Sequence, residues 1–174
     1  MATKSLNGHS RAMLAATAIL AVAVGSVRLY KSDGGQEAHA LGALRAIHSA
    51  QETFAASCAA GGYAASLDGL ATPPKGASAG FVSPGLDIPT GGYGGYTLAL
   101  EPRPKALRLG TASCNGVEAV SSYFAHAEPQ AGISGPSFAM KQDGRIVMRQ
   151  DGAPISDGLD GAELVTRGQS LGGW

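Results

Sequence analysis

Histidine is the residue type in this chain best suited to bind a metal or move a proton, and the sequence holds four: His9, His39, His48 and His126. His39 and His48 lie nine residues apart on a predicted helix. At about 100° per residue, this spacing places them on opposite helix faces, so they cannot share a metal ion. The chain has no HExxH, CxxC, Walker-type phosphate loop or G-x-S-x-G nucleophile motif. We therefore expect surface or packed histidines, no catalytic residues and a protein that is not an enzyme.

An acidic run near the C-terminus, SDGLDGAE, places Asp157, Asp160 and Glu163 beside glycines. Carboxylate oxygens in a turn are ligands that calcium accepts. The spacing matches no EF-hand loop, however, and Asp-Gly pairs are common in plain turns. The sequence therefore predicts turns and no cofactor here, with calcium as the weaker alternative.

The chain has two cysteines, Cys58 and Cys114, far apart in sequence. An apolar segment near the N-terminus indicates export, and exported proteins meet an oxidising environment in which disulfides persist. Closing a loop of this length stabilises a fold by about 4 kcal/mol in the chain-entropy model. We predict a disulfide between Cys58 and Cys114.

The charge balance argues against a polyanionic partner. Lys plus Arg and Asp plus Glu each number 13 in a chain of 174 residues, so no basic excess indicates nucleic-acid binding. Glycine is abundant at 26 residues while charged residues make up only 15%. This composition favours one domain, or one domain plus an anchor, with many turns rather than a helical bundle.

Residues 1–30 form the predicted N-terminal segment, with an apolar run at 12–27 between the basic residues Lys4, Arg11 and Arg28. With Tyr30 the run is just long enough to cross a bilayer. A secretory signal peptide cleaved near Ala23 and a retained signal-anchor are both consistent with it. In either case the remaining chain, residues 31–174, is expected to be exported.

Residues 36–58 form the clearest periodic stretch, and we predict one amphipathic helix there. Apolar side chains recur every three or four residues, as a buried helix stripe requires. Polar side chains fill much of the remaining circumference. The predicted buried stripe is Ala38, Leu41, Leu44, Ile47, Ala50, Phe54 and Cys58, and the predicted polar positions are Glu37, Arg45, Ser49, Gln51 and Glu52.

After this helix, the sequence predicts a loop at 59–92, a sheet at 93–150 and a turn-rich tail at 151–174. Within the loop, Ser66 is suited to cap a short helical turn. Within the sheet region, Asp143-Gly144 predicts a tight hairpin because such a turn needs positive φ. A helix followed by a meander of strands indicates the α+β class. The predicted strands are 96–101, 106–111 returning antiparallel to it, 121–128, 137–141 and 145–149.

Three tyrosines, Tyr63, Tyr93 and Tyr96, lie among glycines. Aromatic side chains concentrate at interfaces, so these residues are candidates for a contact surface. Packing in the core is the favoured interpretation for two of the three.

These segments together resemble the type IV pilin-like family, which includes pilins and type II secretion pseudopilins. The similarity lies in EAHALGALRAIHSAQETFAASC followed by GGYAASLDGLATPP, and it continues through FVSPGLD, GGYTLALEP, SCNG and YFAHAEP to SFAMKQDGRI, so it covers residues 36–149. The resemblance implies a long N-terminal helix whose second half packs on an antiparallel sheet of three or four strands. It also implies that the first half anchors the subunit in the bacterial inner membrane and then builds a filament core.

The sequence departs from the family pattern at its front. Family members carry a leader ending in glycine, then a phenylalanine and a glutamate inside the apolar run, whereas residues 12–27 contain no acidic residue and no F-T-L-x-E stretch. The nearest glycine upstream of the run is Gly8. Since that glutamate takes part in filament assembly in the family, its absence leaves two hypotheses open. The first is a structural subunit that polymerises with copies of itself or with other pilin-like subunits, in a periplasm-spanning or cell-surface filament. The second is a membrane-anchored monomeric binding or adaptor module in the periplasm, held through residues 12–30.

Overall fold

The longest element is the helix α1, Gly34–Ser57, in a computed structural model that describes residues 34–83, 85–86, 93–157 and 163–165. The predicted helix is confirmed, but it begins two residues earlier than expected, and Cys58 lies just beyond its end. Gly34 and Gly35 lie in the first turn, and glycine costs about 0.5–1 kcal/mol per helical position relative to alanine. Burial of the apolar residues that follow outweighs this cost. Predictions for residues 1–30 lie outside the described residues.

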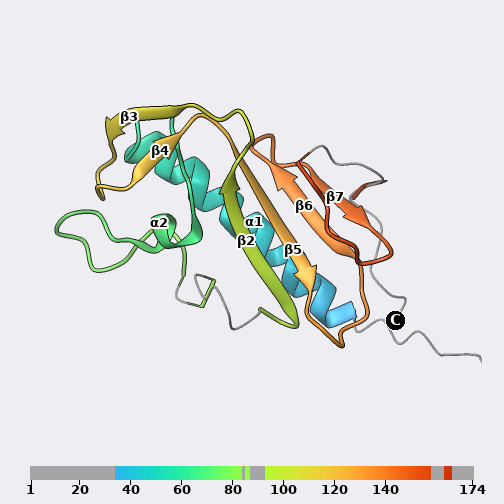
Figure 1. Ribbon diagram of the computed structural model, residues 1–174. Coiled ribbons are helices and arrows are strands. Elements are labelled where there is room, and N and C mark those ends of the chain that lie inside the picture. The colour runs from blue at the N-terminus through green and yellow to red at the C-terminus, as the bar shows by residue number, and fades with distance from the viewer. Residues whose placement is uncertain (1–33, 84, 87–92, 158–162, 166–174) are drawn as a thin grey trace, which may run out of the picture. The chain divides into compact units, whose positions relative to one another are not determined.

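The strands form two antiparallel sheets (Figure 1). The larger has five strands in the order β2-β5-β6-β7-β8 and the smaller has three in the order β1-β4-β3. A short helix, α2 (Leu67–Ala71), follows β1 and is capped by the Ser66 hydroxyl, which accepts from the Gly69 N–H at 3.1 Å, as predicted. The strands are β1 (Tyr63–Ala64), β2 (Tyr96–Pro102), β3 (Arg108–Ala112), β4 (Glu118–Val120), β5 (Tyr123–Pro129), β6 (Ser137–Lys141), β7 (Ile146–Arg149) and β8 (Glu163–Leu164).

The main core lies between α1 and one face of the five-stranded sheet. In Figure 1 the helix runs diagonally behind β2 and β5, and it contacts both of these strands and β6. Because side chains alternate along a strand, every second residue of each strand points at the helix. The buried side chains that meet there include Leu41, Leu44, Ile47 and Phe54 from α1 and Tyr96, Leu98, Leu100, Tyr123, Ala125, Phe138, Met140, Ile146 and Met148 from the sheet.

The opposite face of this sheet is covered in part by the tail. Ile155 packs there with Phe124, Ala139 and Val147 in a second, smaller apolar cluster. The segment that carries Ile155 is therefore part of the folded domain.

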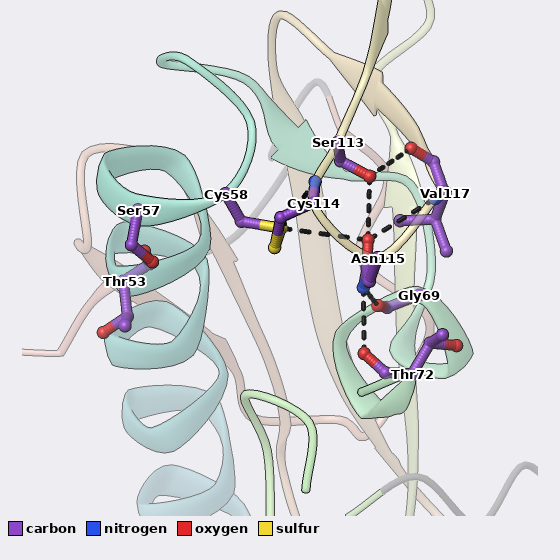
Figure 2. The surroundings of a disulfide bond; sticks show 9 residues. All are labelled: Thr53, Ser57, Cys58, Gly69, Thr72, Ser113, Cys114, Asn115 and Val117. Atoms are coloured by element: carbon purple, nitrogen blue, oxygen red, sulfur yellow. Dashed lines mark hydrogen bonds between the residues drawn. A yellow bond between two sulfur atoms is a disulfide. The ribbon is translucent and has the colours of Figure 1, made fainter. Parts of the chain in front are cut away.

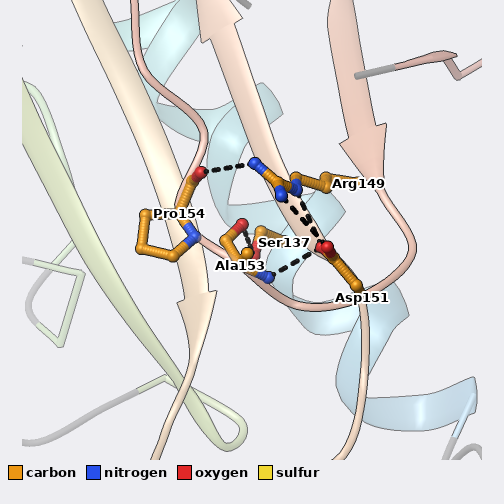
Figure 3. Close-up of polar contacts among 5 residues, drawn as sticks. All are labelled: Ser137, Arg149, Asp151, Ala153 and Pro154. Carbon is orange, nitrogen blue, oxygen red and sulfur yellow. Dashed lines mark hydrogen bonds and ion pairs between the residues drawn. The ribbon is translucent and has the colours of Figure 1, made fainter. Parts of the chain in front are cut away.

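Polar contacts fix the start of the tail beside β6 and β7 (Figure 3). The Arg149 guanidinium donates to both carboxylate oxygens of Asp151, at 2.8 and 3.0 Å. Asp151 also accepts from the Ala153 N–H at 3.0 Å, while the Ser137 hydroxyl donates to the Ala153 carbonyl at 2.8 Å. The hydrogen bond from Arg149 lowers the pKa of Asp151, which stays ionised.

Two predictions about the sheet region are wrong. The expected single sheet of three or four strands is two sheets, and the strand after β2 does not return beside β2. Instead β3 pairs with β4, with Arg108 opposite Val120. Pro102 and Pro104 lack the N–H groups needed to continue a ladder, so the chain leaves β2 and runs to a different sheet.

The predicted faces of α1 need correction at three positions. Glu37 and Gln51 are buried, although the periodic pattern placed them on the polar circumference, and Ala38 is exposed. The buried stripe is wider than the predicted one because both sheets and α2 contact this helix. Among the described residues, no helix combines the length and apolar character needed to cross a membrane.

Candidate functional site

The predicted disulfide is confirmed. Cys58 and Cys114 are joined with an S–S distance of 2.00 Å and a Cα–Cα distance of 4.7 Å. The Cys114 N–H also donates to the Cys58 carbonyl at 2.9 Å. Figure 2 shows this bridge between the end of α1 and the loop that joins β3 to β4. The bridge ties the three-stranded sheet to the helix.

Asn115, next to the disulfide, holds α2 in place. Its side-chain amide donates to the carbonyls of Gly69 and Thr72, both at 2.9 Å. Its side-chain oxygen lies 2.7 Å from the Ser113 hydroxyl (Figure 2). Sequence reasoning did not identify this residue, and the only local signal is an asparagine directly after a bridged cysteine.

Gln51 makes a second polar link that the sequence did not reveal. Its amide nitrogen donates to the Ala64 carbonyl at 2.9 Å, and its oxygen accepts from the Ala64 N–H at 2.8 Å. The side chain is fully buried. Since Ala64 belongs to β1, this pair of bonds completes the pairing of that two-residue strand on the side facing α1.

His39 and His48 make contacts with different elements. The His48 Nδ1 lies 2.8 Å from the Tyr123 hydroxyl, whereas the His39 ring lies 5.9 Å from the ring of Tyr93. Burial raises the pKa of the Tyr123 hydroxyl well above its usual range, with a smaller effect from the Glu52 charge, so this hydroxyl remains neutral. The His126 Nδ1 lies 3.1 Å from a carboxylate oxygen of Glu128. His9 lies outside the described residues.

The calcium candidates do not gather into a site in the described part of the chain. Asp157 forms an ion pair with Arg103 at 2.7 Å. Asp160 lies outside the described residues, and the backbone of Glu163 belongs to β8. Among the residues that the structure describes, no group of three or more His, Cys, Asp or Glu side chains could hold a metal ion.

The three tyrosines have different environments. Tyr96 is buried, Tyr63 is partly buried against the core, and Tyr93 is 39% exposed. The Tyr63 and Tyr123 rings meet edge to face, with centroids 5.0 Å apart. Only Tyr93 is open enough to contribute to a contact surface.

One stripe of the exposed face of α1 has little side-chain bulk, and the larger exposed side chains His39, Arg45 and Glu52 flank it. Gly42 has open space where a Cβ would lie. A groove of about 200 Å³ runs along one flank of this face, between α1 and the residues Phe81, Val82, Ser83 and Leu86. Such a face allows another helix to approach closely, because small residues keep side chains out of the way. The small exposed residues recur along one side of the helix at Ala38, Gly42, Ala46, Ser49, Thr53 and Ala56.

No protein-family model, curated protein or solved structure matches this chain.

Proposed function

We propose that this chain is a pilin-like structural subunit that acts by assembly and not by catalysis. It would build an extracellular or periplasm-spanning filament through its N-terminal helix, with the sheets and loops displayed outward. The arrangement of a helix on an antiparallel sheet, with a disulfide from the helix end to the sheet region, supports the resemblance found in the sequence.

The observation that carries this proposal is the small-residue face of α1. One side of the helix is committed to the core, while the opposite side offers Gly42, Ala46 and Ser49 to solvent. These small residues extend from Ala38 to Ala56, over about five helical turns. Packing of helix against helix uses such a stripe directly. The apolar run at residues 12–27 precedes this helix and would anchor the subunit in the bacterial inner membrane before assembly. The disulfide fits an exported domain in an oxidising compartment.

The proposal is tested with the full-length chain and a variant, Gly42→Arg, examined by negative-stain electron microscopy after detergent removal. Arginine forms helices better than glycine, and a Cβ at this position meets no atom within 4 Å, so the monomer should fold normally. We expect fibres from the wild type and none from the variant, because the long side chain keeps helices apart. Ala131→Arg, an exposed loop position, is the matched control and should still form fibres.

A wild-type chain that stays monodisperse and small in mild detergent would contradict filament assembly. That result would favour the anchored monomeric binding or adaptor module. Mass spectrometry of the mature N-terminus adds a separate test: cleavage after Gly8 supports prepilin-type processing, and cleavage near Ala23 supports a soluble exported domain.

A further inference from the structure

We infer that neighbouring copies make a second contact, in which the free edge of β3 in one copy adds to the free edge of β2 in the next. This inference rests on the proposed assembly, since it describes how the globular domains of adjacent subunits touch. It gives the two sheets a role separate from that of the helix.

β2 is the outer strand of the five-stranded sheet, and the middle of its outer edge is unpaired. Pro129 and Pro102 have no N–H, so the pairs Tyr96–Pro129 and Pro102–Tyr123 are the ones that do not exchange hydrogen bonds. By the alternation of an antiparallel ladder, Leu98 and Leu100 also turn their main-chain groups away from β5. Within the described residues, these outward N–H and C=O groups have no hydrogen-bond partner.

An apolar groove of about 280 Å³ lies along this edge, between β2 and the start of α2. Leu67, Leu98 and Leu100 line it together with Ser66 and Asp68. Asp68 lines the groove, and Glu101 is the residue on β2 directly after Leu100. Both carboxylates are exposed, and neither has an ion-pair partner among the described residues. The edge of β2 is therefore apolar at its centre and acidic at its rim.

β3 ends the three-stranded sheet and has the opposite character. The Ser121 N–H donates to the Leu107 carbonyl at 2.9 Å, so the main-chain groups of Leu107 point toward β4. The main-chain groups of the next residue, Arg108, therefore point outward. Leu107 is 69% exposed and Leu109 is 37% exposed. Lys105, three residues before β3, is exposed and has no ion-pair partner within the described residues, whereas Arg108 is already paired with Glu118.

These two edges complement each other in main chain, shape and charge. An added strand would form hydrogen bonds with the outward main-chain groups of Leu98 and Leu100. The leucines of the added strand would cover the apolar groove. Lys105 of the added copy would lie near Asp68 and Glu101. Pairing β2 with a second β2 would instead crowd like-charged carboxylates, and pairing β3 with β3 would leave the apolar groove open. Because each copy carries one edge of each kind, the contact is head to tail, and a head-to-tail contact that does not close into a ring generates an open chain of subunits.

The test is a charge exchange in the full-length chain, read by sedimentation velocity in mild detergent. Asp68→Lys and Lys105→Glu should each weaken self-association by about tenfold, because each places like charges across the contact. An equal mixture of the two variants should recover association, since every groove then finds an edge of opposite charge. The double variant Asp68→Lys/Lys105→Glu should also recover. Lys75→Glu, an exposed lysine outside both edges, is the control and should behave as wild type.

The inference is overturned if the single variants associate like the wild type, or if neither the mixture nor the double variant recovers. Comparison with Gly42→Arg separates this failure from that of the proposed function. If Gly42→Arg abolishes fibres while the charge variants change nothing, assembly through the helix stands and the edge contact is wrong. If the charge variants act as expected while Gly42→Arg forms fibres, the edge contact stands and assembly through the helix is wrong.

Discussion

The two sheets are held to α1 by different kinds of interaction. The five-stranded sheet packs a continuous apolar face on the helix. The three-stranded sheet, whose strands β1 and β4 have only 2 and 3 residues, depends on the disulfide, Gln51 and Asn115. Such short strands bury too little apolar surface to be stable alone, so covalent and polar links fix them. Damage to the large sheet should therefore destabilise the whole domain, while damage to the small sheet should be felt mainly there.

The largest effect is expected in the core under the five-stranded sheet. Phe138 is fully buried on β6 and its ring lies 5.9 Å from that of Tyr96. Phe138→Ala should lower the free energy of unfolding by about 3–5 kcal/mol, because it removes apolar burial and leaves a cavity. Urea denaturation followed by circular dichroism measures this loss. Leu164→Ala, at a half-exposed position, should change the free energy of unfolding little. A loss equal to that of Phe138→Ala would argue against a single dominant core.

Removing the disulfide should have the next largest effect. The double variant Cys58→Ala/Cys114→Ala should have a free energy of unfolding lower by about 2–4 kcal/mol, because the unfolded chain gains the conformational freedom of a long loop. Hydrogen exchange should show the greatest loss of protection in β1, β3 and β4. A reducing agent should destabilise the wild type by a similar amount and leave the double variant unchanged. Uniform loss of protection in both sheets would contradict the division between them.

Truncation of Gln51 should lower the free energy of unfolding by less than the loss of the disulfide, and its effect should be local to β1. Gln51→Ala leaves the N–H and C=O of Ala64 without their side-chain partners, at an expected cost of about 1–3 kcal/mol. The Ala64 amide should exchange with solvent much faster than in the wild type. Gln150→Ala, at an exposed position, is the matched control. Unchanged exchange at Ala64 would mean that β1 does not depend on this side chain.

The smallest expected effect is a dependence of stability on pH, which arises from Glu37 near the start of α1. Burial raises the pKa of the Glu37 carboxyl above its ordinary value of 4.5. The native state therefore binds the proton more tightly than the unfolded state, and stability falls as pH rises from about 4.5 through the native pKa. Glu37→Gln should remove this fall, so wild type and variant should diverge with increasing pH in thermal unfolding. Parallel curves across this range would contradict a raised pKa.

Local signals in the sequence were sufficient for most single elements. The spacing of leucines and isoleucine indicated α1, and Ser66 indicated the cap of α2. Asp143-Gly144 indicated the hairpin between β6 and β7, where Gly144 has a φ of 72°. The segments of β1, β4 and β8 were missed, β1 within the predicted loop and β8 within the predicted turn-rich tail, because two or three residues are too few to show a period of two.

The sequence by itself determined the α+β class, the main helix, the hairpin and the pairing of the only two cysteines. Each depends on residues close in the chain or, for the cysteines, on the absence of any other partner. Only the tertiary structure decided that the strands divide into two sheets and that Gln51 and Asn115 hold the smaller one. It also decided which strand edges stay free. These features arise between segments distant in sequence, where the partner of a polar group or strand depends on which backbone lies nearby in the folded chain.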